Sequence, residues 1–230
     1  MNCAAIIAAA GSGSRLGSSD PKQLLLLGNI PLFLWSVRAF RRVPAVTRII
    51  MVVPGQRMND FRRVAQASQN LTWVEGGLRR QDSVRAGLGA VGEETDVVLV
   101  HDAARPFVTP RLVELLIDGA WRHGAAIPIA PVTESLKRVS EGQVVQTVER
   151  SGLFLAQTPQ AFRREMLRKV FSSVPGERTW TDEASMFEYA GLSVVAVEGD
   201  YRNIKITYPE DLKYAEFLLH EQSAKGLSPV

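Results

Sequence analysis

The sequence predicts an α/β fold, a three-layer sandwich in which helices cover both faces of a mostly parallel, twisted sheet. Two observations lead to this prediction. Short apolar runs that end at glycine or proline alternate with longer segments of helical periodicity. Runs such as residues 4–8 and 49–53 are continuously apolar, which is typical of strands buried on both faces. Strand, helix and strand at this spacing require right-handed crossovers between parallel strands.

The first half of the chain supplies most of these elements. Strands are expected at residues 4–8, 49–53, 71–74 and 97–101, and helices at residues 31–43, 57–68, 81–91 and 110–123. The helix over 31–43 has its apolar side chains roughly on one face and begins at Pro31, where a missing N–H leaves no hydrogen bond unmade. Gly124 ends the last of these helices, and a further strand is expected at 125–130.

A β-hairpin interrupts this alternation between residues 132 and 157. Residues 136–139 and 144–148 alternate apolar and polar side chains, and Glu141 and Gly142 supply a turn between them. Such a hairpin has no obvious place in the core of a parallel sheet. From the residues alone, it either lies on the surface or forms an arm that grips a partner.

Helical and strand signals resume after the hairpin. Helices are expected at 163–171, 182–189 and 210–221, and short strands at 194–197 and 204–206. The last helix follows Pro209, and Glu210 and Asp211 complement the positive end of its dipole. Residues 224–230 are expected to fray. At about 150 residues per domain, the 230 residues predict one domain, 1–230, with the hairpin as its appendage.

Composition argues against several classes of protein. The chain is 46% hydrophobic and 22% charged, which argues against disorder, and its net charge of +3 does not indicate a nucleic-acid-binding protein. The single cysteine, Cys3, forms no internal disulfide, and no Cys/His cluster suggests structural zinc. No apolar run approaches the roughly 20 residues that cross a bilayer, and the first run lacks the basic region of a signal peptide. We therefore expect a soluble, cytoplasmic protein without a nucleic-acid or membrane partner.

A glycine-rich loop directly after the first strand is the first motif that carries chemistry. Residues 8–17 read Ala-Ala-Ala-Gly-Ser-Gly-Ser-Arg-Leu-Gly, and the glycines let backbone N–H groups approach an anion. Leu16 stands where a dinucleotide fingerprint needs glycine, and the Gly-Lys-Ser/Thr of a P-loop is missing. The loop instead supplies Arg15 and then Lys22, cations that suit a triphosphate whose leaving group is pyrophosphate. The alternative is a plain turn with surface charges.

The second motif is His101-Asp102-Ala103-Ala104-Arg105-Pro106, which follows the strand expected at 97–101. Ligands of open parallel sheets bind beyond the carboxyl ends of the strands, so Asp102 is placed to hold Mg²⁺ against phosphate oxygens. The small residues Ala103 and Ala104 leave room for a ligand, and Arg105 adds a bidentate phosphate donor. The alternative is an Asp–Arg pair that closes a turn. His101 is expected to make local hydrogen bonds rather than act as a base.

The remaining polar segments are less specific by themselves. Residues 76–83 join a strand to a helix; Gly76 and Gly77 permit close approach to a flat ring, whereas Asp82 or Ser83 is explained completely as a helix cap. Further polar residues read individually as caps, turns or surface charges: Arg150, residues 158–160, residues 181–184 and residues 203–205. Lys205 stands out because an ammonium group in the short apolar strand expected at 204–206 needs a partner.

Taken together, these motifs carry a specific resemblance. The glycine loop with Pro21-Lys22-Gln23 is similar to the signature of sugar-phosphate nucleotidyltransferases. With residues 100–106, 181–185 and 203–207, residues 3 to about 218 resemble the family of 2-C-methyl-D-erythritol 4-phosphate cytidylyltransferases. The resemblance implies a Rossmann-like nucleotidyltransferase fold of the glycosyltransferase-A type. It also implies transfer of CMP from CTP to 2-C-methyl-D-erythritol 4-phosphate, with release of pyrophosphate, in isoprenoid precursor synthesis.

The resemblance assigns roles to residues of this sequence. The nucleotide-binding residues would be Ala9, Ala10, Gly11, Ser12, Gly13, Gly77, Ser83 and Ala103. The catalytic residues would be Arg15, Lys22, Arg150 and Lys205, and Asp102 would hold Mg²⁺. The residues that contact the acceptor or the phosphate under attack would be Asp102, Arg105, Ser135, Arg150, Thr158, Thr181 and Lys205.

The resemblance also gives the hairpin a use. Residues 133–150 would be the arm of a homodimer, with Arg150 reaching into the neighbouring subunit's site. The sequence departs from the family pattern at Ala8, where proline often stands, and at Ser135, where threonine is expected. Two alternatives stay open: a ribitol 5-phosphate cytidylyltransferase, and a non-catalytic CTP sensor that signals through the arm. Leu16 disfavours a third, a dinucleotide-dependent oxidoreductase.

Overall fold

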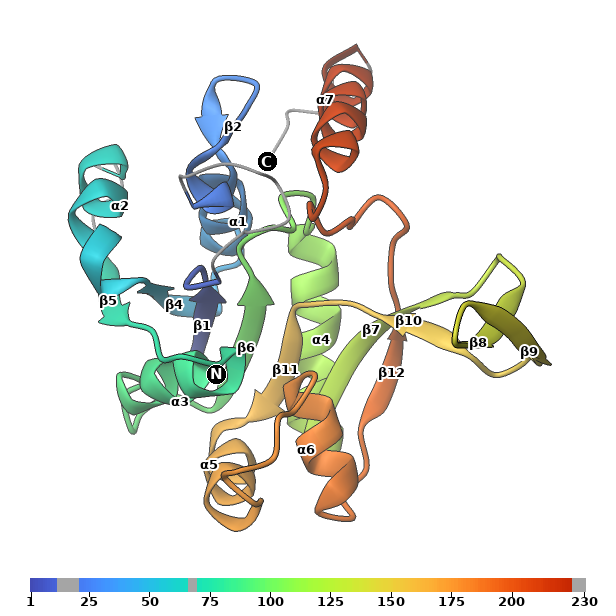
Figure 1. Cartoon of the computed structure of the whole chain (residues 1–230). Helices are drawn as coiled ribbons and strands as arrows, with labels where there is room; N and C mark the ends of the chain where they lie inside the picture. Colours follow the sequence, from blue (N-terminus) through green and yellow to red (C-terminus); the bar gives the residue numbers. More distant parts are fainter. Residues whose placement is uncertain (12–20, 66–69, 225–230) are drawn as a thin grey trace.

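The central sheet brings distant parts of the chain side by side. The computed structural model describes residues 1–11, 21–65 and 70–224. Within them the sheet has eight strands: β1 (Cys3–Ala8), β4 (Val46–Val53), β5 (Leu71–Glu75), β6 (Val97–Asp102), β7 (Ala125–Pro131), β10 (Phe154–Ala156), β11 (Gln160–Arg163) and β12 (Val195–Glu198). Their order is β10-β7-β11-β6-β1-β4-β5, and β12 pairs with β7 outside this path (Figure 1).

The sheet is mostly parallel, as the alternation of strands and helices predicts. Strands β5, β4, β1 and β6 are parallel neighbours, and β12 is parallel to β7. Strand β11 is antiparallel to both β6 and β7, and β10 is antiparallel to β7. Strands β10 and β11 were not predicted from the sequence. Both are short; β10 lies at the end of the segment where the hairpin interrupts the apolar pattern, and β11 follows directly after that segment.

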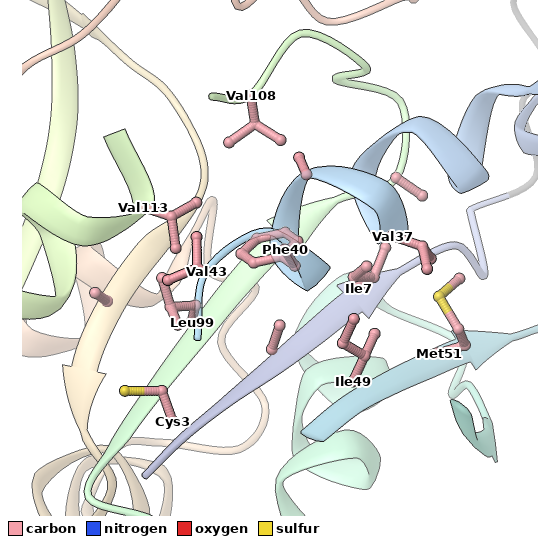
Figure 2. Close-up of a cluster of buried hydrophobic side chains, with 14 of the residues drawn as sticks. Cys3, Ile7, Val37, Phe40, Val43, Ile49, Met51, Leu99, Val108 and Val113 are labelled. Atoms are coloured by element: carbon pink, nitrogen blue, oxygen red, sulfur yellow. The ribbon is translucent and has the colours of Figure 1, made fainter. Parts of the chain in front are cut away.

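Helices cover both faces of the sheet, which confirms the three-layer arrangement. They are α1 (Leu32–Arg41), α2 (Met58–Val64), α3 (Arg80–Gly89), α4 (Pro110–His123), α5 (Arg164–Ser173), α6 (Glu183–Tyr189) and α7 (Pro209–Ala224). Alternate residues of β1 point to opposite faces. Cys3 and Ile7 pack with α1, α2 and α4, and Ala4 and Ile6 pack with α3, α5 and α6. Figure 2 shows the first of these two cores around Phe40 and Leu99.

A third apolar cluster holds the C-terminal helix α7 against residues 25–35. Leu27 and Trp35 pack there with Ile206 and Leu218. Leu27 belongs to a small hairpin of β2 (Leu26–Leu27) and β3 (Ile30–Pro31), which follows the 3-10 helix η2 (Lys22–Leu24). A second 3-10 helix, η3 (Gly55–Arg57), leads into α2. The third cluster therefore fixes Lys22 and the segment before α7 on the same side of the molecule.

The predicted hairpin is confirmed. Strands β8 (Leu136–Ser140) and β9 (Gln143–Val148) form a two-stranded antiparallel sheet, which projects away from the central sheet in Figure 1. Glu141 and Gly142 make the turn with φ of 49° and 79°, a conformation that glycine adopts without strain. Val139, Val144 and Val145 remain exposed on this hairpin.

Several boundaries differ from the predictions. Residues 204–206 do not form a strand; Ile206 N donates instead to Ala104 O at 2.9 Å. The helix expected at 57–68 is α2, which ends at Val64, and residues 66–69 lie outside the described part of the chain. Helix α7 includes Ala224, where fraying was expected to begin, and residues 225–230 are not described. Among the described residues, no helix combines the length and apolar character needed to cross a bilayer.

Candidate active site

A cleft of about 290 Å³ opens where β1 and β6 end beside the start of α3. Ala8 and Asp102 are direct partners in these parallel strands, so the glycine loop and the His-Asp motif leave the sheet at the same edge. Ligands of open α/β sheets bind at this edge. The lining residues are Ala8, Ala10, Gly11, Lys22, Gln23, Gly77, Leu78, Arg79, Arg80, Ser83, Asp102, Ala104, Lys205 and Thr207.

Glycine is required where two loops of the cleft wall meet. A Cβ on Gly76 would lie 2.4 Å from Ala10 Cβ and 2.9 Å from Ser83 Oγ, which are impossible contacts. Gly77 N also donates to Ser83 Oγ at 3.1 Å. The loop after β5 can therefore press against the loop after β1, and these glycines are explained by close packing of protein on protein. Around Gly11, by contrast, the nearest atom of the described residues that an added Cβ would meet is Gln23 Nε2 at 3.9 Å.

The start of α3 has a capping arrangement of the predicted kind. Arg79 is the residue before the helix, and its backbone N donates to Asp82 Oδ2 at 3.2 Å. The prediction that Asp82 or Ser83 caps this helix is thus confirmed for Asp82. Ser83 Oγ contacts Gly77 and the carbonyl of Arg79 instead.

Asp102 is the carboxylate at the centre of the cleft, and cations hold both of its oxygens. Oδ2 lies 2.7 Å from Lys205 Nζ, and Oδ1 lies 3.2 Å from Arg80 Nε. Burial raises the pKa of Asp102, but Arg80 and Lys205 outweigh burial and hold that pKa well below its usual range. The carboxylate is therefore ionised at neutral pH. The predicted partner for the Lys205 ammonium group is found, although no strand forms at 204–206.

A chain of hydrogen bonds behind the cleft fixes the backbone of Asp102. Its N–H donates to Thr158 Oγ1 at 3.0 Å, and that hydroxyl lies 3.2 Å from His101 Nδ1. His101 Nε2 lies 3.1 Å from Arg105 O, an acceptor, so the network assigns the ring proton to Nε2. Burial lowers the pKa of His101 to about 4, which keeps the ring neutral. The expectation that His101 makes local hydrogen bonds is confirmed.

Lys22 places a second lysine ammonium group in the same cleft. Its side chain is only 9% exposed, and Nζ donates to Ile206 O at 2.8 Å. Because Ile206 adjoins Lys205, this contact ties η2 to the segment that carries the lysine partner of Asp102. Lys22, Arg80 and Lys205 therefore converge on a single carboxylate-containing cleft.

The described part of the cleft brings together many, but not all, of the predicted site residues. Those that line it are Ala10, Gly11, Lys22, Gly77, Ser83, Asp102 and Lys205. Ala9 and Ala103 are buried in the core beneath it. Ser12, Gly13 and Arg15 lie outside the described residues.

Other predicted residues lie behind the cleft or elsewhere. Arg105 was expected to face phosphate, but it is not among the lining residues, and its Nη1 donates to Asn203 O at 2.7 Å. Thr158 is buried behind Asp102. Thr181 is exposed, as are Ser135 and Arg150 near the hairpin, and none of these three lines the cleft of its own chain. The guanidinium of Arg150 donates to Thr133 O.

Arg80 and Gln23 line this cleft, although the sequence assigned neither of them a role. Arg80 lies within the segment 76–83, but its importance comes from Asp102 and from Glu183, which is 103 positions away in the chain. Gln23 is 3% exposed, donates to Gly11 O at 3.3 Å and has no partner for Oε1 within the described part of the chain. Its place in the Pro21-Lys22-Gln23 signature is the signal that could have singled it out.

The donors of the cleft fit a magnesium ion bound together with a phosphate ligand. The described residues contain no group of three or more His, Cys, Asp and Glu side chains that could hold a metal alone. Magnesium in phosphate-transfer sites takes one or two carboxylates and completes its shell with phosphate oxygens and water. Asp102 supplies one ionised carboxylate in this cleft.

Comparison with known proteins extends the likeness over nearly the whole chain. The family model of 2-C-methyl-D-erythritol 4-phosphate cytidylyltransferase matches residues 3–221. The enzyme of that name from Syntrophus aciditrophicus is 39% identical over 227 residues, 96% of this chain and 97% of the relative. A bifunctional IspD/IspF enzyme from Desulfotalea psychrophila is 44% identical over 223 residues, and the match spans 96% of this chain but only 58% of that relative.

Solved structures of similar proteins also match over nearly the whole chain. The crystal structure of 2-C-methyl-D-erythritol 4-phosphate cytidylyltransferase from Thermus thermophilus matches with a TM-score of 0.81 and 32% identity, covering 96% of this chain and all of that one (100%). The 4-diphosphocytidyl-2C-methyl-D-erythritol synthase of Anaerococcus prevotii matches with a TM-score of 0.83 and 28% identity, covering 95% and 98%. Since fold, cleft and family model agree over this length, the chain belongs to the 2-C-methyl-D-erythritol 4-phosphate cytidylyltransferase family.

Proposed function

We propose that the protein transfers CMP from CTP to 2-C-methyl-D-erythritol 4-phosphate, forming 4-diphosphocytidyl-2-C-methyl-D-erythritol and pyrophosphate for isoprenoid precursor synthesis. The observation that carries this proposal is one cleft at the carboxyl edge of the sheet in which Arg80 and Lys205 contact the ionised Asp102 and Lys22 lines the same wall. Two polyanions must meet for this reaction, and a cleft rich in fixed cations lowers their mutual repulsion.

The chemistry requires no general base from the protein. The nucleophile is a phosphate oxygen of the acceptor, which is largely ionised at neutral pH because its second pKa is about 6. This agrees with a His101 ring that is neutral, fully buried and committed to Thr158 and Arg105. The protein's task is to align the two phosphates, which can contribute about 7–11 kcal/mol, and to stabilise the charge that develops at the α-phosphorus.

The cations divide this task. Lys22, held by Ile206 O, stabilises the transition state from the wall of the cleft. Lys205 is 40% exposed along its side chain and addresses the phosphate of the acceptor. Arg15, which the family resemblance assigns with Lys22 to the transition state, lies outside the described residues. Backbone groups at Ala10, Gly11 and Gly77, with Ser83, form the nucleotide side of the cleft.

Asp102 would hold the magnesium ion, which supplies charge neutralisation at the phosphates when it is bound. Thr158 and His101 keep the backbone of Asp102 in place for this role. Arg105 and Asn203 hold the strip of chain that carries Lys205, since Arg105 Nη1 donates to Asn203 O and Asn203 Nδ2 donates to Thr158 O at 2.9 Å. The predicted contacts of Thr181, Thr158 and Arg105 with the acceptor remain part of the proposal.

The proposal extends to the assembly. The chain acts as a single cytoplasmic domain whose hairpin, residues 133–150, docks on a second copy and brings Ser135 and Arg150 to the neighbouring cleft. Val139 and Val144 are exposed and paired across the hairpin, so they form an apolar patch on one face that a second copy would cover. That neither Ser135 nor Arg150 lines the cleft of its own chain agrees with such an exchange.

A substrate panel tests the function. Pyrophosphate release is measured with ATP, CTP, GTP and UTP against methylerythritol phosphate and ribitol 5-phosphate, with Mg²⁺ or with EDTA. We expect turnover with CTP and methylerythritol phosphate, and its loss in EDTA. Preference for ribitol 5-phosphate would replace the acceptor in this proposal. Saturable, Mg²⁺-dependent CTP binding without turnover would instead identify a CTP sensor.

A further inference from the structure

Three consecutive residues at the start of α3 each bond to the segment that leads into α6. Arg79 Nη1 donates to Gly176 O at 2.8 Å. Gln81 Nε2 donates to Arg178 O at 2.9 Å, and Gln81 Oε1 accepts from Trp180 N at 2.8 Å. Arg80 Nη1 donates to both carboxylate oxygens of Glu183, at 2.8 and 2.9 Å. The wall of the cleft that carries Arg80 is therefore held from behind by residues 176–183.

The carboxylate of Glu183 is not needed to start its own helix. Asp182 caps α6, because its Oδ1 accepts from Ser185 N at 2.9 Å. Gln160 of β11 ties the same helix end to the sheet through Asp182 Oδ2 and Ala184 N, at 2.8 and 3.1 Å. Glu183 has no exposed surface, and a carboxylate is costly to bury without a partner. Its side chain is committed to Arg80.

The Arg80–Glu183 pair differs from the Lys205 contact in rigidity. Arg80 is gripped by Glu183 and touches Asp102 Oδ1 through Nε, with 25% of its side chain exposed. Lys205 reaches Asp102 Oδ2 from a side chain that is 40% exposed. Burial opposes the charge of Arg80, but Glu183 and Asp102 outweigh burial and raise the pKa of Arg80, so the guanidinium stays charged. Of the two partners of Asp102, Arg80 is thus also bound by the buried Glu183, and Lys205 is the more exposed.

We propose that Glu183 is a positioning residue that acts through Arg80. It anchors the guanidinium and balances its positive charge. Arg80 can then orient Asp102, and the negative charge of Asp102 stays available to a divalent cation. This inference rests on the proposed function, in which Asp102 holds Mg²⁺. A buried ion pair is not explained by stability alone, because apolar side chains of similar size in its place stabilise a fold equally well. When Glu183 is replaced by a neutral side chain, Asp102 alone balances the guanidinium charge of Arg80. The guanidinium then competes with the divalent cation for the Asp102 carboxylate.

The test measures CTP binding by titration calorimetry at a series of Mg²⁺ concentrations, for the wild type, Glu183→Gln and a control. The control is Glu165→Gln, because Glu165 is a 74% exposed surface carboxylate that also pairs with an arginine, Arg164. Groups that hold a metal ligand in place typically contribute about 10–100-fold to metal affinity. For Glu183→Gln we expect the Mg²⁺ concentration at half-maximal CTP affinity to rise roughly tenfold, with Mg²⁺-free CTP binding little changed. The control follows the wild type.

Two outcomes overturn the proposal. An unchanged Mg²⁺ dependence in Glu183→Gln removes the coupling to Asp102, and an equal loss of CTP affinity at every Mg²⁺ concentration assigns Glu183 a structural role. If Glu183→Gln does not fold, as judged by thermal melting, Glu183→Asp takes its place. This variant keeps the negative charge but shortens the reach to Arg80. We expect a smaller shift of the Mg²⁺ dependence in the same direction, and the absence of any shift refutes the proposal. A wild type that does not bind CTP with Mg²⁺ contradicts the proposed function itself.

Discussion

Lys22 is a largely buried cation on the wall of the cleft. The residue is 9% exposed, and its Nζ donates to Ile206 O. An ammonium group is flexible and strongly hydrated, so its proposed role depends on being held in one direction. The ordered contact with Ile206 fixes the direction of the charge before substrate arrives, which is how fixed groups stabilise a transition state more than a ground state.

Replacing Lys22 tests this use directly. Lys22→Ala is expected to lower kcat roughly 10²–10³-fold, by analogy with the loss of one oxyanion donor, and to change the KM for CTP much less. Steady-state pyrophosphate release measures both constants. Lys213→Ala, an exposed lysine of α7, is the matched control and should leave both unchanged. A kcat near the wild-type value in Lys22→Ala would remove Lys22 from the transition state.

His101 predicts a pH dependence of stability. Its folded-state pKa is lowered by burial from 6.5 to about 4, so the unfolded chain binds a proton that the folded chain refuses between these values. The contribution of His101 to the free energy of unfolding is therefore fully present above pH 6.5. It falls as the pH drops toward 4, by up to about 1.36 kcal/mol per pH unit.

Denaturant unfolding between pH 7 and 4.5 measures this slope. His101→Gln has no imidazole to protonate, so its stability should depend less steeply on pH, even if its stability is lower overall. His123→Gln, at an exposed histidine, should retain the wild-type slope. Equal slopes in all three proteins would mean that His101 is not the group responsible.

At the scale of elements, the hairpin forms a two-stranded sheet of its own, separate from the central sheet of the described residues. Strands β8 and β9 pair with each other and expose Val139, Val144 and Val145, at 57%, 64% and 57%. Val139 and Val144 are paired across the hairpin and form a small apolar patch on one of its faces. The sequence left the choice between a surface hairpin and a gripping arm open, and this patch is the surface that the proposed arm would bury.

If the hairpin is the arm of a homodimer, a charge on its apolar face should dissociate the dimer. Val144→Asp places a charge on the apolar surface of the hairpin and is expected to shift a homodimer to monomer, as measured by light scattering after gel filtration. Val64→Asp, at a 40% exposed valine of α2, is the control and should leave the mass unchanged. Because Arg150 is proposed to serve the neighbouring cleft, activity should fall together with the dimer. A wild-type monomer at assay concentrations would refute the assembly.

For the whole molecule, ligand binding should add to stability, since the cleft joins parts of the chain that are otherwise far apart. Its walls come from β1, β6, the start of α3 and the strip around Lys205. A ligand that binds only this assembled cleft stabilises the fold by about 2.7 kcal/mol at 100 times its Kd. For a domain of this size, that corresponds to a rise in Tm of roughly 5–10 °C.

Thermal melting with CTP and Mg²⁺ checks this expectation. The rise in Tm should shrink when EDTA removes the metal, because Asp102 then repels the phosphates rather than bridging to them. UTP serves as the comparison nucleotide and should stabilise less. Equal stabilisation by CTP with and without Mg²⁺ would contradict the role given to Asp102.

The sequence alone determined the alternation of strands and helices and the place of the main motifs. Continuous apolar runs and helical periodicity are local patterns. In a parallel sheet the strand ends lie at one edge, which predicted a ligand site at Asp102. The glycine loop's own cations singled out Lys22, and the family resemblance gave Lys205 its role. Only the tertiary structure decided that Arg105 turns to Asn203, that β11 enters the sheet antiparallel, and that Arg80 joins Asp102 to Glu183. These depend on strand order and on pairs of residues far apart in the chain, and an arginine or glutamate carries no local pattern that names its distant partner.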